Sequence, residues 1–209
     1  IVLDLDGDGF ELISLKQSKA KFDWDADGKR DKTGWVSSDD GLLVFDRNGD
    51  GKITAANEVS FGTRGDEETF VSDLEGLRVF DTNNNGSFDV GDSEFANFSV
   101  WQDLDADGVS DPGELRGLSD VGLHALALSA FQTGDPIVAK QNTIYAITDA
   151  VFEDGSTIKV ADALLAFKGS YHSGHKDLAG AFVQAESEMP LHSSPITSVS
   201  GFLQVVDLV

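Results

Sequence analysis

The feature that most constrains this chain is a short acidic pattern that recurs between Asp4 and Glu114. Each copy carries Asp or Asn at its first, third and fifth positions and glycine at the sixth. Alternate side chains of such a tightly turning loop point toward one centre, and glycine makes the sharp turn at little steric cost. Calcium prefers six to eight oxygen ligands at about 2.3–2.6 Å. The pattern therefore predicts calcium loops.

Five such loops can be read from the sequence, and together they predict up to five bound Ca²⁺ ions. A solvated Asp-Gly turn is the alternative for any single copy, because these residues favour turns. Repetition makes that alternative weak for the set. The predicted metal ligands are, loop by loop, Asp4, Asp6 and Asp8; Asp23, Asp25, Asp27 and Asp31; Asp46, Asn48, Asp50 and Glu58; Asp81, Asn83, Asn85, Asp89 and Asp92; and Asp103, Asp105, Asp107, Asp111 and Glu114.

The fourth and fifth loops are the most complete. Glu114 occupies the twelfth position of the fifth loop, where an EF-hand has a bidentate carboxylate. Asp92 occupies the same position of the fourth, as in dockerin-type loops. The second and third loops have Gly34 and Asn57 there, although Glu58 follows one place later.

The first loop has Leu15 at its twelfth position and needs ligands from elsewhere. Glu11 or a distant carboxylate could supply them. The Asp39-Asp40-Gly41 segment lacks the loop pattern. It either donates carboxylates to the first or second loop or forms a simple turn, and we count Asp39 and Asp40 among the candidate ligands.

Composition excludes several classes of function. Acidic residues number 37 against 15 basic ones, giving a net charge of -22 that repels nucleic acid and anionic membrane surfaces. The absence of cysteine excludes disulfides and zinc-thiolate sites. No apolar run approaches the ~18 residues of a membrane span. We expect no nucleic-acid partner and no membrane insertion.

The imperfect loops also suggest a compartment. Loops without a bidentate final carboxylate belong to the weaker end of the calcium range, roughly 10⁻⁴–10⁻³ M, which is typical of extracellular modules. Without calcium, the clustered carboxylates should keep the chain loose. We therefore expect a protein that folds after export, outside the cell.

The predicted fold class is α+β, with short strands and helices organised around the calcium loops. Ser72 and Glu75 form a capping-box signal that predicts a helix–loop–helix over 72–98. Further helices are expected over 115–121 and 160–167. Strands are expected over 41–45, 98–101 and 123–129.

The chain changes character after about residue 130. A β-hairpin is predicted from 144–152 and 157–160, turning at Asp154-Gly155. Residues 1–185 are predicted to form the calcium-binding module. Residues 186–209, with a serine- and proline-containing linker and a strand at 202–206, are predicted to form a separate extension.

No conventional enzyme is indicated. The sequence has no glycine-rich phosphate loop, no histidine with triad partners and no paired carboxylate pattern for glycoside hydrolysis. Its Asp111-Pro112 and Asp135-Pro136 bonds are interpreted as parts of a calcium loop and a turn rather than as cleavage sites.

Several motifs resemble the calcium-loop module of large secreted RTX proteins, over roughly residues 1–165. These are the segments 2–9 (VLDLDGDG), 33–36 (TGWV), 39–44 (DDGLLV) and 100–103 (VWQD). One branch of that family is the self-processing module of FrpC-type proteins, in which calcium triggers cleavage at an Asp-Pro bond just before the LDLDGDG strand. The other acts as a calcium-dependent peptide-binding domain of giant RTX adhesins.

The resemblance leans toward the adhesin branch, on segments 57–61 (NEVSF) and 73–77 (DLEGL). It implies a monomeric module, within a longer chain that is secreted or held at the bacterial cell surface. The module would bind a peptide or protein terminus on a host or neighbouring cell surface. The alternatives are autocatalytic Asp-Pro processing and a structural, calcium-stiffened spacer. The ligand-contacting residues stay unassigned.

Overall fold

The computed structural model describes residues 1–62, 72–129 and 131–168. The predicted extension, 186–209, lies outside these residues, as does its strand at 202–206. In the described part of the chain, no helix has the length and apolar character needed to cross a membrane.

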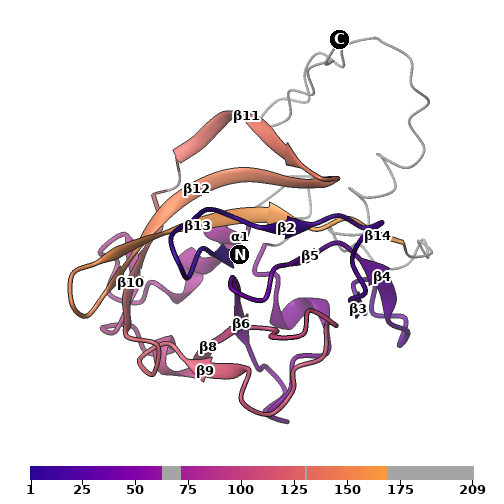
Figure 1. Ribbon diagram of the computed structural model, residues 1–209. Helices are drawn as coiled ribbons and strands as arrows, with labels where there is room; N and C mark the ends of the chain where they lie inside the picture. Colours follow the sequence, from indigo (N-terminus) through magenta and orange to yellow (C-terminus); the bar gives the residue numbers. More distant parts are fainter. Residues whose placement is uncertain (63–71, 130, 169–209) are drawn as a thin grey trace, which may run out of the picture.

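A nine-stranded antiparallel sheet forms the body of the molecule, and it curls into a half-barrel (Figure 1). β11 (Phe131–Ala139) pairs with one of its long strands, β12. The other strands follow the order β7 (Ser87–Asp89), β10 (Leu123–Ala127), β12 (Asn142–Phe152), β13 (Thr157–Leu164), β1 (Val2–Leu3), β6 (Gly41–Phe45), β8 (Phe98–Trp101) and β9 (Leu115–Gly117).

Two small sheets hold the remaining strands. β14 (Phe167–Lys168), β4 (Asp31–Thr33) and β3 (Lys21–Phe22) form one of them. β2 (Leu12–Ile13) and β5 (Trp35–Val36) form the other. Most of these strands are only two or three residues long, because the acidic loops between them occupy so much of the chain.

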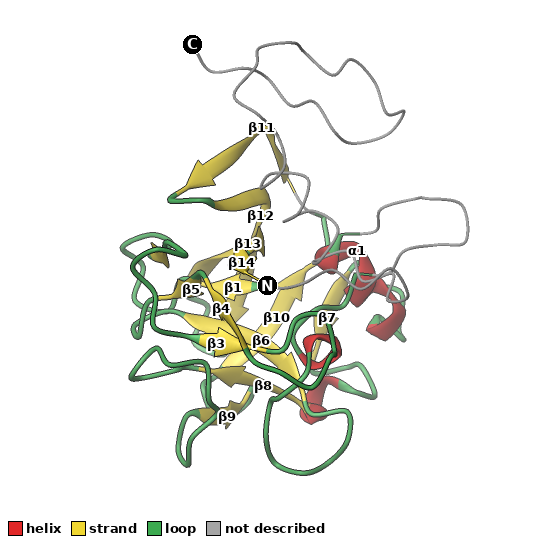
Figure 2. Ribbon diagram, turned by 90° about the vertical axis from the view of Figure 1, so that its right-hand side faces the viewer, coloured by secondary structure: helices red, strands yellow, loops and turns green. Residues whose placement is uncertain are grey.

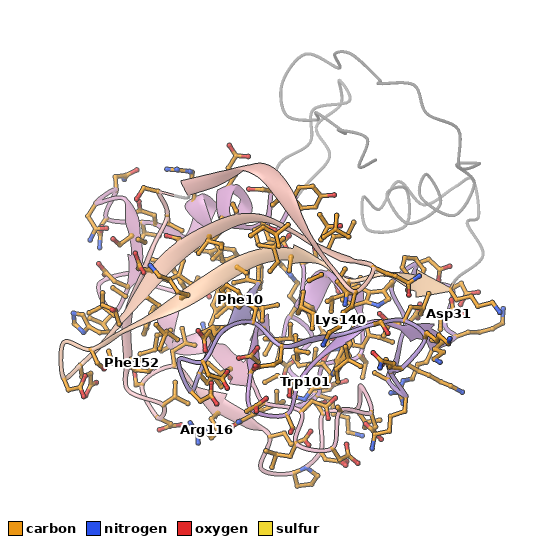
Figure 3. All side chains as sticks on the ribbon, turned by 45° about the horizontal axis from the view of Figure 1, so that its top comes forward. Phe10, Asp31, Trp101, Arg116, Lys140 and Phe152 are labelled. Atoms are coloured by element: carbon orange, nitrogen blue, oxygen red, sulfur yellow. The ribbon has the colours of Figure 1, made fainter. Side chains whose placement is uncertain are left out.

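The hydrophobic core has two parts, one on each face of the central strands. Alternation along β6 sends Leu43 into one part, with Phe88 and Phe98, and Leu42 into the other, with Trp35 and Trp101. All these side chains are at most 2% exposed. The tryptophans beside the acidic loops are thus core residues, and Figure 3 shows Trp101 in the interior and Asp31 at the edge.

The α+β prediction is wrong, because the protein is mostly β. Strands account for 38% of the described residues and helices for 9%. The helical segments are α1 (Asp73–Gly76) and three short 3-10 turns, η1 (Ala56–Glu58), η2 (Leu77–Phe80) and η3 (Phe95–Asn97). Figure 2 shows α1 and its neighbouring turns gathered beside the sheet.

The errors have a physical origin in competition between local and long-range pairing. The capping box of Ser72 and Glu75 is present, but the helical segment ends at Phe80, where the fourth loop draws the backbone into turns around Asp81. The expected helix at 160–167 is instead the continuation of β13, which pairs with both β12 and β1. Local helix propensity is a weak signal against such ladders.

Most of the predicted strands are present in the structure. β6 and β8 match the expected ranges 41–45 and 98–101, and β10 covers most of 123–129. The predicted hairpin is present as β12 and β13, and Gly155 turns it with a φ of 83°. The expected helix at 115–121 begins instead as β9, since Leu115 to Gly117 pair with β8.

Candidate metal centres

The fifth loop is the most deeply built of the acidic clusters. Asp103, Asp105 and Asp107 each bring a carboxylate oxygen within 4.8 Å of the others. Asp103 is fully buried, and its Oδ2 accepts hydrogen bonds of 2.7 Å from Gly108 N and Trp35 Nε1. Burial raises the pKa of Asp103, although these donors favour its charged form. A cation beside this carboxylate would stabilise that charge.

Glu114, at the twelfth position of the fifth loop, binds donors on both sides of that loop. Its Oε1 accepts from Leu104 N at 2.9 Å, and its Oε2 accepts from Asp111 N at 2.9 Å and from Trp101 Nε1 at 3.3 Å. The side chain of Asp111 is exposed and forms none of these bonds. The loop is thus tied to the core through two buried tryptophans.

The fourth loop is organised mainly by its own backbone. Asp81 accepts from Asn85 N at 3.0 Å and from Gly86 N at 2.9 Å. Asp92 is engaged by Thr82 N, Asn83 N and Asp89 N, at 2.7, 3.2 and 2.9 Å. The side-chain amides of Asn83 and Asn85 donate to the Asp89 carboxylate. The predicted ligands therefore meet around one turn, close to the protein surface.

The third loop has the same internal turns. Asp46 accepts from Gly49 N and Gly51 N, both at 2.8 Å, and Asn48 and Asp50 each accept from a later amide. Glu58, 1% exposed, accepts from Thr54 N and Ala55 N through Oε2. Its Oε1 is buried without a partner. Glu58, which lies one place after the twelfth position of the third loop, is therefore inside the fold next to that loop.

In the second loop, Asp23, Asp25 and Asp27 bring carboxylate oxygens within 4.8 Å of one another. Asp25 is 9% exposed, and both of its oxygens are buried without a hydrogen-bond partner. Burial and the charges of these three carboxylates raise the pKa of Asp31, on β4. Four acidic side chains thus lie close together here, and the one base described beside them, Lys29, pairs with Asp27 at 3.1 Å and acts on Asp25 through its charge alone.

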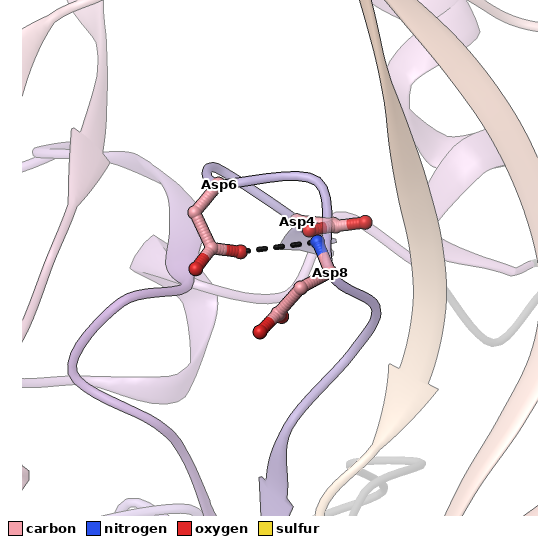
Figure 4. Close-up of side chains that lie close together, drawn as sticks. All are labelled: Asp4, Asp6 and Asp8. Atoms are coloured by element: carbon pink, nitrogen blue, oxygen red, sulfur yellow. Dashed lines mark hydrogen bonds between the residues drawn. The ribbon is translucent and has the colours of Figure 1, made fainter.

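The first loop gathers Asp4, Asp6 and Asp8, again within 4.8 Å (Figure 4). Asp8 N donates to Asp6 Oδ1 at 3.2 Å, and Gly7 N donates to Asp4 Oδ1 at 2.8 Å. Asp4 is buried, and the other two carboxylates are exposed.

Additional carboxylates complete the first loop from outside it. Asp6, Glu11 and Asp40 form a further group within 4.8 Å. Asp40 is fully buried with Oδ1 unpartnered, and Glu11 Oε2 is also buried without a partner. Burial and the neighbouring carboxylates raise the pKa of Glu11 to about 7. Burial, with the charges of Asp4 and Asp39, raises the pKa of Asp40 to about 6.

Asp40, one of the candidate ligands, therefore joins the first loop rather than the second. Asp39 is exposed and acts on both Glu11 and Asp40 through its charge. Glu11, considered only as a possible extra ligand, is an integral member of the cluster.

Three loops are joined to one another. Lys21 N, before the second loop, donates to Asp107 O of the fifth at 3.1 Å. Ile53 N of the third donates to Ser110 Oγ of the fifth at 2.9 Å. The Arg30 guanidinium binds the carbonyls of Lys21, Asp107 and Gly108, bridging the second and fifth loops.

Ser110 and Arg30 were not identified from the sequence. Neither carries a signal of its own, because a serine or arginine near an acidic loop is ordinary in a charged chain. The tryptophans did carry a signal, their position beside the loops, but not their bonds to Asp103 and Glu114.

The buried oxygens provide a test of whether a cation fits. Unpartnered acceptors in the described residues are confined to Glu11, Asp25, Asp40 and Glu58, and each belongs to an acidic cluster. A buried carboxylate without a partner is costly, and a metal ion removes that cost. Hard oxygens in loops of this type suit calcium or magnesium.

Comparison with known proteins identifies the family. Residues 1–166 match the family described as the SPM domain. The chain belongs to the SPM-domain family. A relative, the iron-regulated protein FrpA of Neisseria meningitidis serogroup C, is 39% identical over 181 residues. The match covers 85% of this chain and 16% of FrpA, so the chain spans a small part of that relative. The SPM-domain match includes all five acidic loops and ends within the described residues.

Proposed function

We propose that this SPM domain is a calcium-folded module of an exported RTX-family protein, and that the folded module cleaves its own chain at an Asp-Pro bond just before Ile1. The relation to FrpA supports the RTX assignment and the export. The reaction follows the FrpC-type branch of the resemblance, and the SPM-domain match together with the similarity to FrpA supports a module related to that branch.

Calcium dependence is supported by the unpartnered carboxylate oxygens. Asp25, Asp40 and Glu58 are at most 9% exposed and retain oxygens to which no group in the described part of the chain donates. Calcium bound by such groups in the folded chain, and only weakly by the unfolded one, converts binding energy into folding energy. The residues that would hold the ions are those of the five loops, with Glu11 and Asp40 completing the first.

Processing is supported by the observation that Ile1 lies inside the fold. Its side chain is 3% exposed and belongs to the hydrophobic core. Its carbonyl accepts a hydrogen bond of 3.0 Å from Leu43 N on β6. A peptide bond just before Ile1 would therefore be held at a fixed place in the folded domain. Fixed geometry is what an intramolecular attack by an aspartate on its own carbonyl requires.

The folding of β1 provides the link to calcium. β1 leads directly into the first loop, and its two neighbours, β6 and β13, lie on either side of it. Loading the first loop would fix the end of β1 and hence the position of Ile1. Calcium can thus act as the trigger without touching the bond that breaks.

The test uses the full-length parent protein, or this domain with the native residues that precede Ile1. The protein is unfolded in EDTA, and calcium or magnesium is then added at millimolar concentration. We expect tryptophan fluorescence to report folding, and a denaturing gel with mass spectrometry to show cleavage before Ile1 in calcium alone. A folded protein that stays intact in calcium contradicts the processing function, and equal folding in EDTA contradicts the calcium function.

Peptide binding, the function of the adhesin branch, is a second candidate that β11 favours. In the described residues this strand pairs with β12 alone, and Ile137 and Val138 are 46% and 65% exposed. An extended peptide from a host or neighbouring cell could add to such an edge. Retention of a peptide library by the calcium-loaded domain, lost with Val138→Lys, would support it. No retention would count against it.

A further inference from the structure

Two carboxylates lie beside Ile1 and belong to none of the metal clusters of the described residues. Asp73 Oδ2 is 3.8 Å from the main-chain nitrogen of Ile1. Asp162 is 5% exposed on β13. The register of β1 with β13 pairs Val2 with Ala161, so the next rung of this antiparallel ladder brings Asp162 opposite Ile1.

Asp73 is fixed by three donors to one of its oxygens. Its Oδ1 accepts from Ser60 Oγ at 2.8 Å, Phe61 N at 2.9 Å and Gly62 N at 2.7 Å. Its Oδ2 is the oxygen nearest the Ile1 nitrogen. The carboxylate is therefore pre-oriented toward the main chain at Ile1, where the polypeptide enters the fold.

Asp162 is held from the same side. Its Oδ2 accepts from Leu74 N at 3.3 Å, and the Ser72 hydroxyl also donates to it. Burial and the neighbouring charge of Asp73 raise the pKa of Asp162 to about 6. An amino group at Ile1 opposes this rise, and that charge is absent when another residue precedes Ile1. Asp162 is thus a buried carboxyl able to hold a proton near neutral pH.

We propose that Asp162 is the acid that protonates the leaving proline nitrogen in the cleavage before Ile1, and that Asp73 is a positioning residue for the main chain there. This inference rests on the proposed processing function. The proline nitrogen would lie one residue before Ile1, and one residue spans at most about 3.6 Å. That places the nitrogen within reach of side chains that surround Ile1.

The step balances without a co-reactant. The carboxylate of the upstream aspartate attacks its own carbonyl carbon, forming a cyclic anhydride as the carbon–nitrogen bond to proline breaks. The nitrogen leaves with the electron pair and takes the proton of Asp162, which becomes a carboxylate. Water, or an amine, then opens the anhydride. An amide nitrogen is a poor leaving group unless it is protonated, so a positioned acid should contribute strongly.

The experiment measures calcium-triggered cleavage in the parent protein with Asp162→Asn, Asp73→Asn and a control, Asp149→Asn. Asp149 lies on the adjacent strand, is half-buried and pairs with Lys159 at 2.6 Å. We expect Asp162→Asn to slow cleavage at least ~100-fold while the domain still folds in calcium. Asp73→Asn should slow it about tenfold through misplacement of the bond, and Asp149→Asn should cleave at the wild-type rate.

A second measurement separates an acid from a purely structural residue. The wild-type cleavage rate, measured in saturating calcium, should fall as pH rises through the pKa of Asp162, which burial and Asp73 raise above its ordinary value and which no amino group at Ile1 lowers in the parent protein. Asp73 is the carboxyl that faces it. A folded Asp162→Asn protein that cleaves at the wild-type rate overturns the acid role, and so does a wild-type rate that shows no fall with rising pH over the range in which the calcium-loaded domain stays folded. An intact wild-type protein overturns the processing function itself, and the role of the pair with it.

Discussion

The fourth and fifth loops share one sequence pattern, yet the fold uses them differently. In the fifth, Asp103 is fully buried and bonded to Trp35, and Glu114 is bonded to Trp101. In the fourth, Asp81 and Asp92 are engaged by backbone amides of the loop itself. A cation at the fifth loop therefore acts on the hydrophobic core, whereas one at the fourth acts on a local turn. Similar ligand sets can differ greatly in what they stabilise.

The largest difference should appear when the first ligand of each loop is removed. Asp103→Ala leaves Gly108 N and Trp35 Nε1 without their acceptor in the interior, so we expect a loss of about 4 kcal/mol in unfolding free energy. Asp81→Ala should cost about 1 kcal/mol, because its amide donors are exposed to water. Urea unfolding in saturating calcium measures both, and equal losses would show that the two loops are equivalent.

The glycines at the sixth positions should sharpen the same contrast. Gly108 and Gly86 have φ values of 77° and 84°, so alanine is strained at both. A Cβ at Gly108 would lie 2.6 Å from Lys21 O, a backbone atom, whereas one at Gly86 meets nothing within 4 Å. We expect a cost of about 3 kcal/mol for Gly108→Ala and about 1 kcal/mol for Gly86→Ala, measured as above. The reverse order would contradict the observed packing of the fifth loop on β3.

Protonation should affect the two loops with opposite sign when calcium is absent. Burial raises the pKa of Asp103 above its ordinary value of 3.8, so the folded protein favours the protonated carboxyl. The stability that this adds is fully present below pH 3.8 and is lost as pH rises through the raised pKa of the folded state. Burial favours the neutral form of Asp92 too, but its backbone donors outweigh this and lower its pKa. The stability that the charged Asp92 adds is therefore present above pH 3.8, the ordinary pKa of an aspartate, and is lost as pH falls through the lowered pKa of the folded state.

The measurement is unfolding free energy against pH in EDTA, with an osmolyte to maintain the folded state. Above pH 3.8, the slope of unfolding free energy against pH should be more positive in Asp103→Asn than in the wild type. Below pH 3.8, the same slope should be less positive in Asp92→Asn than in the wild type. Parallel curves for the two variants would show that burial does not distinguish these carboxylates.

The sequence was sufficient to predict the local parts of this structure. The loop pattern indicated which carboxylates cluster, because spacing within a tight turn determines where Asp23, Asp25 and Asp27 point. Apolar runs indicated the buried strands at 41–45 and 98–101. Both features depend on residues close together in the chain.

Long-range pairing explains what the sequence could not show. The segments 115–117 and 160–164 are strands because distant partners complete their ladders, and no local pattern reveals those partners. The completion of the first loop by Asp40 and the approach of Asp73 and Asp162 to Ile1 also depend on the folded sheet. The fold class was wrong for the same reason.

The smallest expected effect concerns the link between the second and fifth loops. Arg30 is exposed, but its guanidinium donates to Lys21 O and Gly108 O, both at 2.7 Å. Arg30→Met removes these bonds and keeps much of the aliphatic stem, so we expect a loss of about 1 kcal/mol. Lys32→Met is the matched control, since Lys32 donates only to Lys16 O and joins no two loops.

Calcium titration followed by tryptophan fluorescence tests whether that link carries cooperativity. If Arg30 couples the two loops, Arg30→Met should lower the Hill coefficient of the folding transition, and Lys32→Met should leave it unchanged. Coupling through Lys21 N and Ser110 Oγ remains in the variant, so the transition should broaden rather than split. An unchanged Hill coefficient with the same loss of stability would assign Arg30 a local role. The fifth loop would then differ from the fourth by its burial alone.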